Sequence, residues 1–568
     1  MRRPFVTLLA AGLQLLPAAG HAQAPQLAPS MITRIDSVFA MYATRTSPGC
    51  ALGVVRDGQT VFEKGYGMSD FQHGVPITPS SIFHVASISK QFAAMSIVLL
   101  ARDGKLSLDD DVRKYVPEVP DFGKRITIRH LIHHTSGLRD QWSLLAMSGW
   151  RADDPKTESD ILWLVSRQRA LNFEPGAEHL YSNTGFTLLG TIVKRVSGRS
   201  LREFTAERIF TPLGMTSTHF HDDHSMIVPG RTSAYIARQG AGRGGAAMGV
   251  DDYAISIPVF DNAGATSLFT TVQDLAKWDQ NFLRPVVGDN QTIAQMHERG
   301  RLNNGSDIPY AFGLVHGQYR GLTTIGHSGS DAGYRADFLR FPDQRTSFIT
   351  LCNVGSANPG LLNRGVASIV LADRMTPPAT NGTSQPATVT EVPIDPEVLR
   401  GFAGLYLDTK TEAQAEAVFQ ASSGTLYTGR GAQAPKLRHV GNNEFVIVAP
   451  NGDRLGRVRF GQGTATDLDA NVTLQRMDAP DISRARLAGF IGRYRSEELD
   501  VQWSIALGAD TALVLSRRRA PDQRLSATYA NGFAGAVGNI RFTRGSDGRV
   551  NGFLLTSGRI RHIRFERQ

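Results

Sequence analysis

The segment Phe83-His84-Val85-Ala86-Ser87-Ile88-Ser89-Lys90-Gln91-Phe92 decides how the rest of the chain is interpreted. The residues that follow it, up to Arg102, are mostly apolar and include no Gly or Pro. Asp103-Gly104 then ends this run, so the pattern predicts a helix with a glycine stop signal. Residues three apart lie on one face of a helix, which allows Ser87 and Lys90 to touch.

Ser87 and Lys90 have the chemistry of a nucleophile and its base. A serine hydroxyl is a poor nucleophile at neutral pH unless a neighbour takes its proton. Lysine can do so when burial or nearby positive charge lowers its pKa. At the first turn of a helix, Ser87 also lies where free backbone N–H groups favour a developing negative charge. A Ser-x-x-Lys pattern is expected about once by chance in a chain of this length, so further motifs must support it.

Length and composition exclude several classes of protein. A chain of 568 residues is too long for one hydrophobic core and predicts three or four domains. The hydrophobic content of 41% and charged content of 20% are those of a globular protein. The net charge is +9, but only Arg517-Arg518-Arg519 forms a compact basic cluster, which we interpret as a solvated strand end. No groove-reading or base-stacking motif accompanies the charge, so we expect no nucleic-acid partner.

The N-terminus has the three-part order of a secretory signal peptide. Arg2-Arg3 precede the apolar run from Phe5 to Leu16, and small residues then extend to Ala22. We therefore expect residues 1–22 to be removed and the mature protein to be secreted or periplasmic. The apolar run is too short for a permanent anchor, and no later stretch has the length of a transmembrane helix.

The middle of the chain predicts an α+β domain over residues 27–373. Helical patterns lie between two early and three late strand patterns, so we expect both ends of this region to complete one sheet. The predicted strands are Gly49–Val55, Gln59–Gly65, Thr323–His327, Tyr334–Phe341 and Thr346–Asn353, and the predicted helices include Leu27–Tyr42, Thr184–Val196 and Thr271–Phe282.

Residues 374–394 have the composition of a linker, and the chain beyond them changes character. The pattern Leu399-x-Gly-Phe-x-Gly-x-Tyr406 recurs as Leu487-x-Gly-Phe-x-Gly-x-Tyr494. Short alternating strands and frequent Gly turns follow each copy. We therefore predict two related units, residues 395–480 and 481–568, each a small antiparallel, lipocalin-like β-barrel.

Two cysteines, Cys50 and Cys352, each lie in an apolar strand-like run. Export permits a disulfide, and two buried free thiols account for the sequence equally well. The segment His219-Phe220-His221-Asp222-Asp223-His224 matches the ligand spacing of metallo-hydrolases. It does not follow an apolar strand and has no convincing later partners, so we interpret it as a polar surface loop and predict no metal and no cofactor.

Two later elements follow Ser87-x-x-Lys90 in a meaningful order: Tyr181-Ser182-Asn183 before a helix, and His327-Ser328-Gly329-Ser330 at a strand end. At this point the chain resembles the serine β-lactamase and penicillin-recognising family, on the side of class C β-lactamases, DD-peptidases and related esterases. The resemblance spans Leu27 to Asp373 and implies an antiparallel sheet with a helical subdomain. Connecting segments that also fit are Leu131–Gly137, Phe173–Gly176, Pro212–Met215 and Asp274–Trp278.

The resemblance implies a role for each motif residue. Ser87 is expected to form an acyl-enzyme, with Lys90 and Tyr181 sharing the proton transfers; which of the two is the base stays open. The expected substrate-binding and oxyanion residues are Asn183, His327, Gly329 and Ser330, with the backbone N–H groups of Ser87 and Ser330 forming the oxyanion hole.

His327 stands where β-lactamases usually carry a lysine. A largely neutral histidine holds a substrate carboxylate less well, so the resemblance favours D-aminopeptidases and esterase-like relatives over efficient β-lactamases. A D-aminopeptidase with this arrangement also carries two C-terminal barrels, one of which narrows the active site. We expect a small-molecule or peptide substrate, peptidoglycan-derived peptides included. The alternative is a weakly catalytic or non-catalytic penicillin-binding protein that recognises the cell wall.

Overall fold

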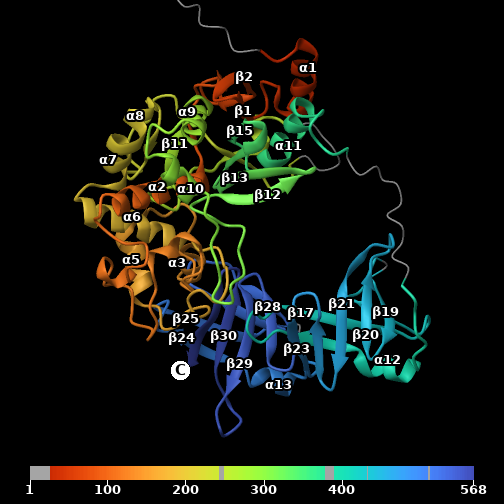
Figure 1. Cartoon of the computed structure of the whole chain (residues 1–568). Coiled ribbons are helices and arrows are strands. Elements are labelled where there is room, and N and C mark those ends of the chain that lie inside the picture. The colour runs from red at the N-terminus through yellow and green to blue at the C-terminus, as the bar shows by residue number, and fades with distance from the viewer. Residues whose placement is uncertain (1–25, 242–247, 378–388, 432, 510–511) are drawn as a thin grey trace, which may run out of the picture.

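The computed structural model describes residues 26–241, 248–377, 389–431, 433–509 and 512–568. The predicted signal peptide, residues 1–22, and the centre of the predicted linker lie outside the described residues. Figure 1 shows an α+β unit followed by two β-barrels that lie side by side. None of the helices in the described ranges is long and apolar enough to cross a bilayer.

A six-stranded antiparallel sheet forms the centre of the α+β unit, in the order β12-β13-β14-β15-β1-β2. Early strands therefore pair directly with late ones, which confirms that both ends of this region complete one sheet. The edge strand β12 was not predicted, because its side chains are largely exposed and carry no apolar alternation. The strands are β1 (Cys50–Arg56), β2 (Gln59–Tyr66), β12 (Val315–Tyr319), β13 (Leu322–Asp331), β14 (Tyr334–Phe341) and β15 (Thr346–Cys352).

Helices cover both faces of this sheet. The terminal helices α1 (Pro29–Val38) and α11 (Pro359–Val370) pack on one face, and α9 (Val272–Leu283) packs on the other. Alternate residues of β1 accordingly enter different cores: Leu52 and Val54 join the α1–α11 side, and Ala51 and Val55 join the α9 side. The structure also joins Cys50 to Cys352 in a disulfide between directly paired residues of β1 and β15.

The helical part is built around α2 (Ser89–Arg102), in which every residue from Ser89 through Leu100 is buried. A helix buried on all sides is a core helix, so the nucleophile motif begins at the centre of the domain. Ser87 itself lies in a short 3₁₀ turn, Ala86–Ile88, and not in the first turn of α2 as predicted. The other helices around α2 are α3 (Ile128–Ile132), α4 (Gln141–Met147), α5 (Glu158–Ser166), α6 (Asn183–Ser197), α7 (Leu201–Thr205) and α10 (Asn290–Met296).

The C-terminal part forms two closed barrels, as predicted, each of eight strands. The first contains β16 (Gly404–Leu407), β17 (Gln414–Gln420), β18 (Thr425–Thr428), β19 (Lys436–Gly441), β20 (Glu444–Val448), β21 (Arg454–Gly461), β22 (Thr464–Asp467) and β23 (Val472–Met477). The second contains β24 (Gly492–Ser496), β25 (Val501–Leu507), β26 (Leu513–Ser516), β27 (Gln523–Tyr529), β28 (Gly532–Gly535), β29 (Gly538–Arg544), β30 (Val550–Ser557) and β31 (Ile560–Arg567).

The sequence repeat marks the same junction in both barrels, where a short helix, α12 (Pro396–Phe402) or α13 (Arg484–Ala488), enters the first strand. The hydroxyl of the repeated tyrosine donates to the carbonyl oxygen four residues earlier, at 2.9 Å for Tyr406 and 2.7 Å for Tyr494. An arginine of the last strand, Arg476 or Arg567, donates to two carbonyl oxygens at this junction. The two barrels thus close in the same way.

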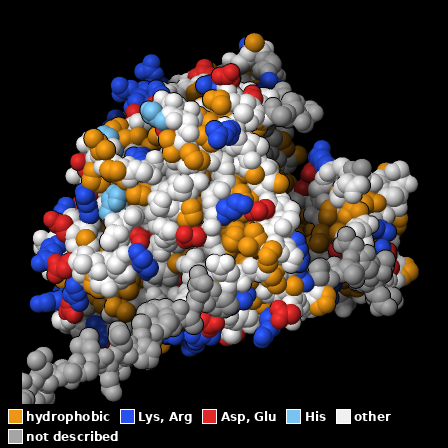
Figure 2. All heavy atoms as spheres, turned by 90° about the horizontal axis from the view of Figure 1, so that it is seen from above, with side chains coloured by type: hydrophobic (Ala, Val, Ile, Leu, Met, Phe, Trp, Pro, Cys, Tyr) orange, Lys and Arg blue, Asp and Glu red, His pale blue; other side chains and the backbone are white. Residues whose placement is uncertain are grey.

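The second barrel packs against the α+β unit, below α3 and α5 in Figure 1. Its buried side chains belong to the same hydrophobic core as those of α2 and α6, whereas the first barrel has a core of its own. Arg139 and Glu498 form an ion pair across this contact, 2.6 Å apart, and both side chains are almost fully buried. Arg519, from the basic cluster at the end of β26, pairs with Asp154 at its edge. On the face in Figure 2, basic and acidic side chains are interspersed.

Candidate active site

The Ser87 turn lies against strand β13, and Gly329 makes this approach possible. A Cβ atom at Gly329 would stand 2.2 Å from the carbonyl oxygen of Val85, a distance that no side chain can occupy. Ala86, next to Ser87, adopts a φ of +47°, which is uncommon for a residue with a side chain. Residues with unusual backbone angles cluster at functional sites, and here one precedes the predicted nucleophile.

Lys90 lies directly behind Ser87 and is completely buried. Its Nζ atom is 3.0 Å from Ser87 Oγ, 2.9 Å from Asn183 Oδ1 and 2.7 Å from the carbonyl oxygen of Ala265. Burial holds the pKa of Lys90 well below its ordinary value. The charge of Arg559 lowers this pKa further, and the charge of Asp140 raises it.

The three contacts of Lys90 Nζ indicate where the hydrogens and the lone pair of the neutral amine would lie. A neutral amine has two hydrogens and one lone pair. The oxygens of Asn183 and Ala265 only accept, so they take the two hydrogens. When Lys90 is neutral, its lone pair is therefore left for Ser87 Oγ, 3.0 Å away, which is the arrangement that a base needs.

Asp140 fixes the orientation of the Asn183 side chain. One carboxylate oxygen of Asp140 accepts hydrogen bonds from both Asn183 N and Asn183 Nδ2, each at 2.8 Å. Because a carboxylate only accepts, the Asn183 amide must point its oxygen the other way, towards Lys90. Asp140 is itself held by the backbone N–H groups at the start of α4. It is therefore a positioning residue that acts on Lys90 through Asn183.

Tyr181 is brought to the same place from the segment before α6. The Lys90 Nζ atom lies 4.9 Å from the centre of its ring. Burial raises the pKa of Tyr181, and its interactions with Ser87 and Arg559 oppose this rise. The buried hydroxyl makes no hydrogen bond of good geometry within the described residues, so it stays free for a substrate. A phenol with a raised pKa remains protonated and can give its proton away.

His327 uses both ring nitrogens within the protein. Its Nδ1 atom lies 2.6 Å from the carbonyl oxygen of Ser328, which can only accept, so Nδ1 carries the hydrogen. Nε2 then accepts from the hydroxyl of Tyr310 at 3.0 Å. Burial is the main cause that lowers the pKa of His327 to about 4. The histidine is therefore neutral near pH 7.

These residues border one cleft of about 950 Å³ between the sheet, the helical part and the second barrel. Ser87, Tyr181, Asn183, His327 and Ser330 line it, while Lys90 and Gly329 lie just behind its wall. Strand β12 pairs with β13 only as far as Gly326, so the segment that carries Ser330 faces the Ser87 turn instead. Aromatic and aliphatic side chains form the outer wall: Trp142, Leu145, Trp150, Ile257 and Phe260. The structure thus brings together all seven residues predicted from the sequence.

Known proteins resemble this chain in sequence and in fold. The model of the family described as Beta-lactamase matches residues 35–371. The chain belongs to the Beta-lactamase family. A D-aminopeptidase from Cereibacter sphaeroides is 27% identical over 455 residues, which cover 80% of each chain. Penicillin-binding protein 4* from Bacillus subtilis is 30% identical over 310 residues, 52% of this chain and 66% of that protein.

The fold has solved counterparts as well. The structure of the octameric penicillin-binding protein homologue from Pyrococcus abyssi covers 78% of this chain and 98% of its own, with a TM-score of 0.52 and 21% identity. These likenesses and the Ser87–Lys90 geometry identify the Beta-lactamase family domain as that of a serine hydrolase.

The sequence did not reveal three residues of this site. Asp140 follows the Thr135-Ser136-Gly137 motif by three positions, but nothing in its local pattern links it to Asn183. Tyr310 lies in an irregular segment before β12. Arg559 belongs to the second barrel, where the sequence predicted only β structure; its guanidinium carbon lies 4.7 Å from the centre of the Tyr181 ring.

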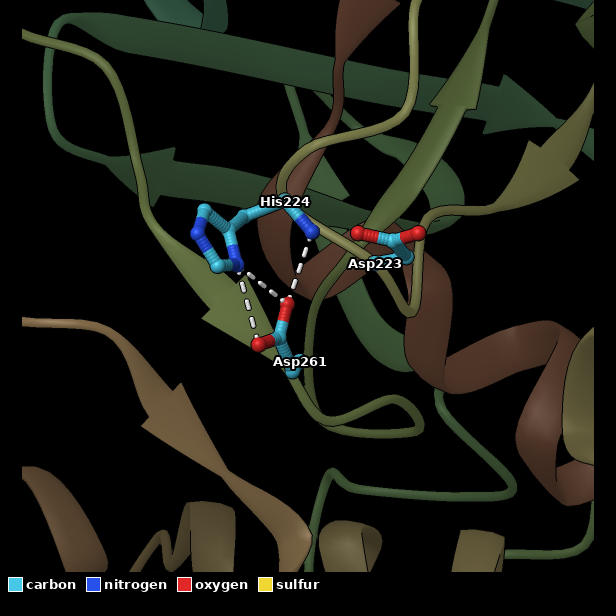
Figure 3. A group of neighbouring side chains, drawn as sticks. All are labelled: Asp223, His224 and Asp261. Carbon is cyan, nitrogen blue, oxygen red and sulfur yellow. Dashed lines mark hydrogen bonds and ion pairs between the residues drawn. The ribbon is translucent and has the colours of Figure 1, made fainter.

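The structure divides the histidine-rich segment that resembled a zinc motif. His219 and His221 both pack against Phe269, and burial lowers the pKa of each to about 4. Figure 3 shows His224 turned towards Asp261, with its Nδ1 atom 2.8 Å and 2.9 Å from the two carboxylate oxygens. Asp223 completes a group whose possible ligand atoms lie within 4.8 Å of one another. Its own carboxylate accepts from the Ser225 hydroxyl, so Asp223 is turned to Ser225, and the group as a whole is largely exposed.

Proposed function

We propose that this serine hydrolase is exported and cleaves an amide or ester through an acyl-enzyme on Ser87. We further propose that D-amino-acid peptides, D-amino-acid amides and carboxylic esters are better substrates than β-lactams. The observation that carries the proposal is the fully buried amine of Lys90, whose Nζ atom lies 3.0 Å from Ser87 Oγ. This geometry activates a serine without a histidine base.

The residues can share the reaction as follows. Ser87 Oγ attacks the carbonyl carbon while its proton passes to Lys90 Nζ, and the backbone N–H groups of Ser87 and Ser330 stabilise the oxyanion. The Tyr181 hydroxyl gives its proton to the leaving nitrogen or oxygen, and the Lys90 ammonium then reprotonates Tyr181. A water next attacks the acyl group as its proton passes to Lys90. That proton returns to Ser87 Oγ when the acid leaves.

The preference for non-lactam substrates rests on His327. A β-lactam carries a carboxylate, which an ammonium at this position would bind. The neutral His327 has no charge to offer, and its hydrogen is already given to the Ser328 carbonyl oxygen. A relative that covers most of this chain is described as a D-aminopeptidase, which supports the same preference.

Export is proposed from the charged, apolar and small-residue order of residues 1–22. The disulfide between Cys50 and Cys352 supports it, since such bonds persist in oxidising compartments. The likeness to penicillin-binding protein 4* favours a second candidate, a weakly catalytic protein that binds cell-wall peptides. The Lys90 arrangement speaks against this candidate, because binding alone does not need a positioned base.

A substrate panel tests the proposal. Wild type and Ser87→Ala are compared on D-alanyl p-nitroanilide, its L-isomer, p-nitrophenyl acetate and a chromogenic cephalosporin. Ser96→Ala is the matched control, since Ser96 is a buried serine of the following helix α2 and donates to the Phe92 carbonyl oxygen. We expect turnover of the D-amide or the ester by wild type and Ser96→Ala, and none by Ser87→Ala. Equal rates in wild type and Ser87→Ala, or turnover of the cephalosporin alone, would contradict the proposal.

A further inference from the structure

We propose that Arg559 of the second barrel binds a carboxylate on the leaving group of the substrate, and so makes the enzyme prefer peptides with a free C-terminus one residue beyond the scissile bond. This inference rests on the proposed function. It assigns substrate recognition to one side chain of the cleft, which follows Tyr181 by 378 positions in the sequence.

The backbone of Arg559 is firmly attached to the α+β unit. It lies in the turn between β30 and β31, and its carbonyl oxygen accepts a hydrogen bond from Asn172 Nδ2 at 3.0 Å. Two residues later, Arg561 N donates to Asn172 Oδ1 at 2.9 Å, and the Arg561 side chain pairs with Glu178. The turn is thus held on both sides of Arg559, and its side chain projects into the cleft.

The N–H groups of the Arg559 guanidinium, in contrast, have no hydrogen-bond acceptor among the described residues. Its nearest carboxylate is Asp140, at 3.6 Å, which is longer than a hydrogen bond. Both oxygens of Asp140 are already occupied by N–H groups of Asn183, Trp142 and Ser143. Within the described residues, the Arg559 side chain donates no hydrogen bond, and 44% of it is exposed.

The other cations of the cleft do not share this freedom. Arg151 forms an ion pair with Asp153 at 2.7 Å. Lys156 donates to the carbonyl oxygens of Ala152, at 2.8 Å, and Asp154, at 2.5 Å. Among the cleft-lining cations, Arg559 is therefore the one whose side chain donates no hydrogen bond within the described residues.

The chemistry and position of Arg559 point to a carboxylate on the leaving group. A guanidinium presents a planar pair of N–H donors that matches a carboxylate, and a cleft wall shields such a pair from water. Its carbon lies 4.7 Å from the ring of Tyr181, whose hydroxyl is proposed to protonate the leaving nitrogen. Arg559 therefore lies beside the residue that is proposed to act on the leaving group.

The test uses two dipeptides that differ only at the C-terminus: D-alanyl-D-alanine with a free carboxylate, and its C-terminal amide. For wild type we expect kcat/KM to be about 10- to 100-fold higher for the free acid, mainly through a lower KM. Arg559→Gln should bring the ratio of kcat/KM between free acid and amide near one. Arg559→Lys keeps the positive charge but loses the planar pair of N–H donors, so it should give an intermediate ratio. Arg564→Gln is the control, because Arg564 lies on the strand β31 that follows Arg559 and pairs with exposed Glu566.

The ratio separates this inference from the proposed function. A wild-type ratio near one overturns the inference, as does an unchanged ratio in Arg559→Gln. An equal loss on both dipeptides also overturns it, since a structural change or a shifted Lys90 pKa acts on both. In each case, turnover that still requires Ser87 leaves the proposed function intact. If neither dipeptide, nor any amide or ester of the panel, is cleaved by wild type, both are overturned.

Discussion

At the scale of single residues, the site depends on an amine whose pKa is held well below its ordinary value. Lys90 is fully buried, and burial is the largest cause of its lowered pKa. Three charged neighbours adjust this effect: the negative charges of Asp140 and Asp331 raise the pKa of Lys90, and the positive charge of Arg559 lowers it. Because only the neutral amine accepts the Ser87 proton, activity should fall as the pH drops through this pKa.

The acid limb of the pH profile should therefore move in opposite directions in two variants. Asp140→Asn removes a charge that raises the Lys90 pKa, so the limb should shift to lower pH. Arg559→Gln removes a charge that lowers it, so the limb should shift to higher pH. The measurement is kcat/KM against pH with the uncharged ester p-nitrophenyl acetate.

Arg564→Gln serves again as the control and should leave the limb in place. Asp140→Asn is also expected to lower the rate at every pH, because Asn183 loses the acceptor that fixes its amide. A loss that is equal at every pH lowers the whole profile but does not change the pH at which the acid limb has its midpoint, and this midpoint is the quantity compared. Shifts in the same direction, or no shift in either variant, would contradict the account of Lys90.

At the scale of structural elements, strand β13 and the Ser87 turn must touch at Gly329. Gly329→Ala should lower kcat/KM by about 10- to 100-fold, because a displacement of the strand by even 1 Å misplaces Ser330 relative to Ser87. The cause is the contact that a Cβ atom would make with the Val85 carbonyl oxygen, at 2.2 Å. The loss of kcat/KM is measured with p-nitrophenyl acetate as the substrate.

Gly317→Ala is the matched control for this variant. Gly317 lies on the neighbouring edge strand β12, and its Cβ atom would meet only the side-chain oxygen of Thr324, at 3.1 Å. We expect this control to retain wild-type activity. Unchanged activity in Gly329→Ala would show that the close approach is not required.

Most elements of the α+β unit follow from sequence pattern alone. Strands β14 and β15 and helix α2 are buried on all sides, so they appear in the sequence as largely uninterrupted apolar segments whose lengths separate strand from helix. The exposed edge strand β12 has no such signal. The start of α2 was also placed too early, because the positive φ of Ala86 makes a separate turn that no local residue pattern predicts.

At the scale of the whole molecule, the second barrel is joined to the site through buried polar contacts. Arg139 precedes Asp140 and pairs with Glu498 of the barrel, while Arg559 reaches Tyr181. The repeat of Tyr406 and Tyr494 predicted two barrels. It could not predict which one docks beside Ser87, since the docking contacts are single residues hundreds of positions apart.

Breaking the buried ion pair should loosen this contact. Glu498→Gln leaves the Arg139 charge buried without a counter-charge and should cost about 3–5 kcal/mol of stability. Thermal unfolding, together with hydrogen exchange of the β30–β31 turn, measures the effect. Glu497→Gln is the control: its pair with Arg169 is exposed and should contribute less than about 1 kcal/mol. Equal effects of the two substitutions would contradict a structural role for the buried pair.

The claim that Ser87 carries the acyl group is tested most directly by trapping that group. Wild type, Ser96→Ala and Ser87→Ala are incubated with a fluorescent penicillin or a D-alanyl p-nitrophenyl ester, quenched in acid and analysed by intact mass and peptide mapping. The account predicts a single acyl adduct in wild type and Ser96→Ala, located on the peptide that contains Ser87, and none in Ser87→Ala. An adduct on another residue, or one that persists in Ser87→Ala, would contradict it.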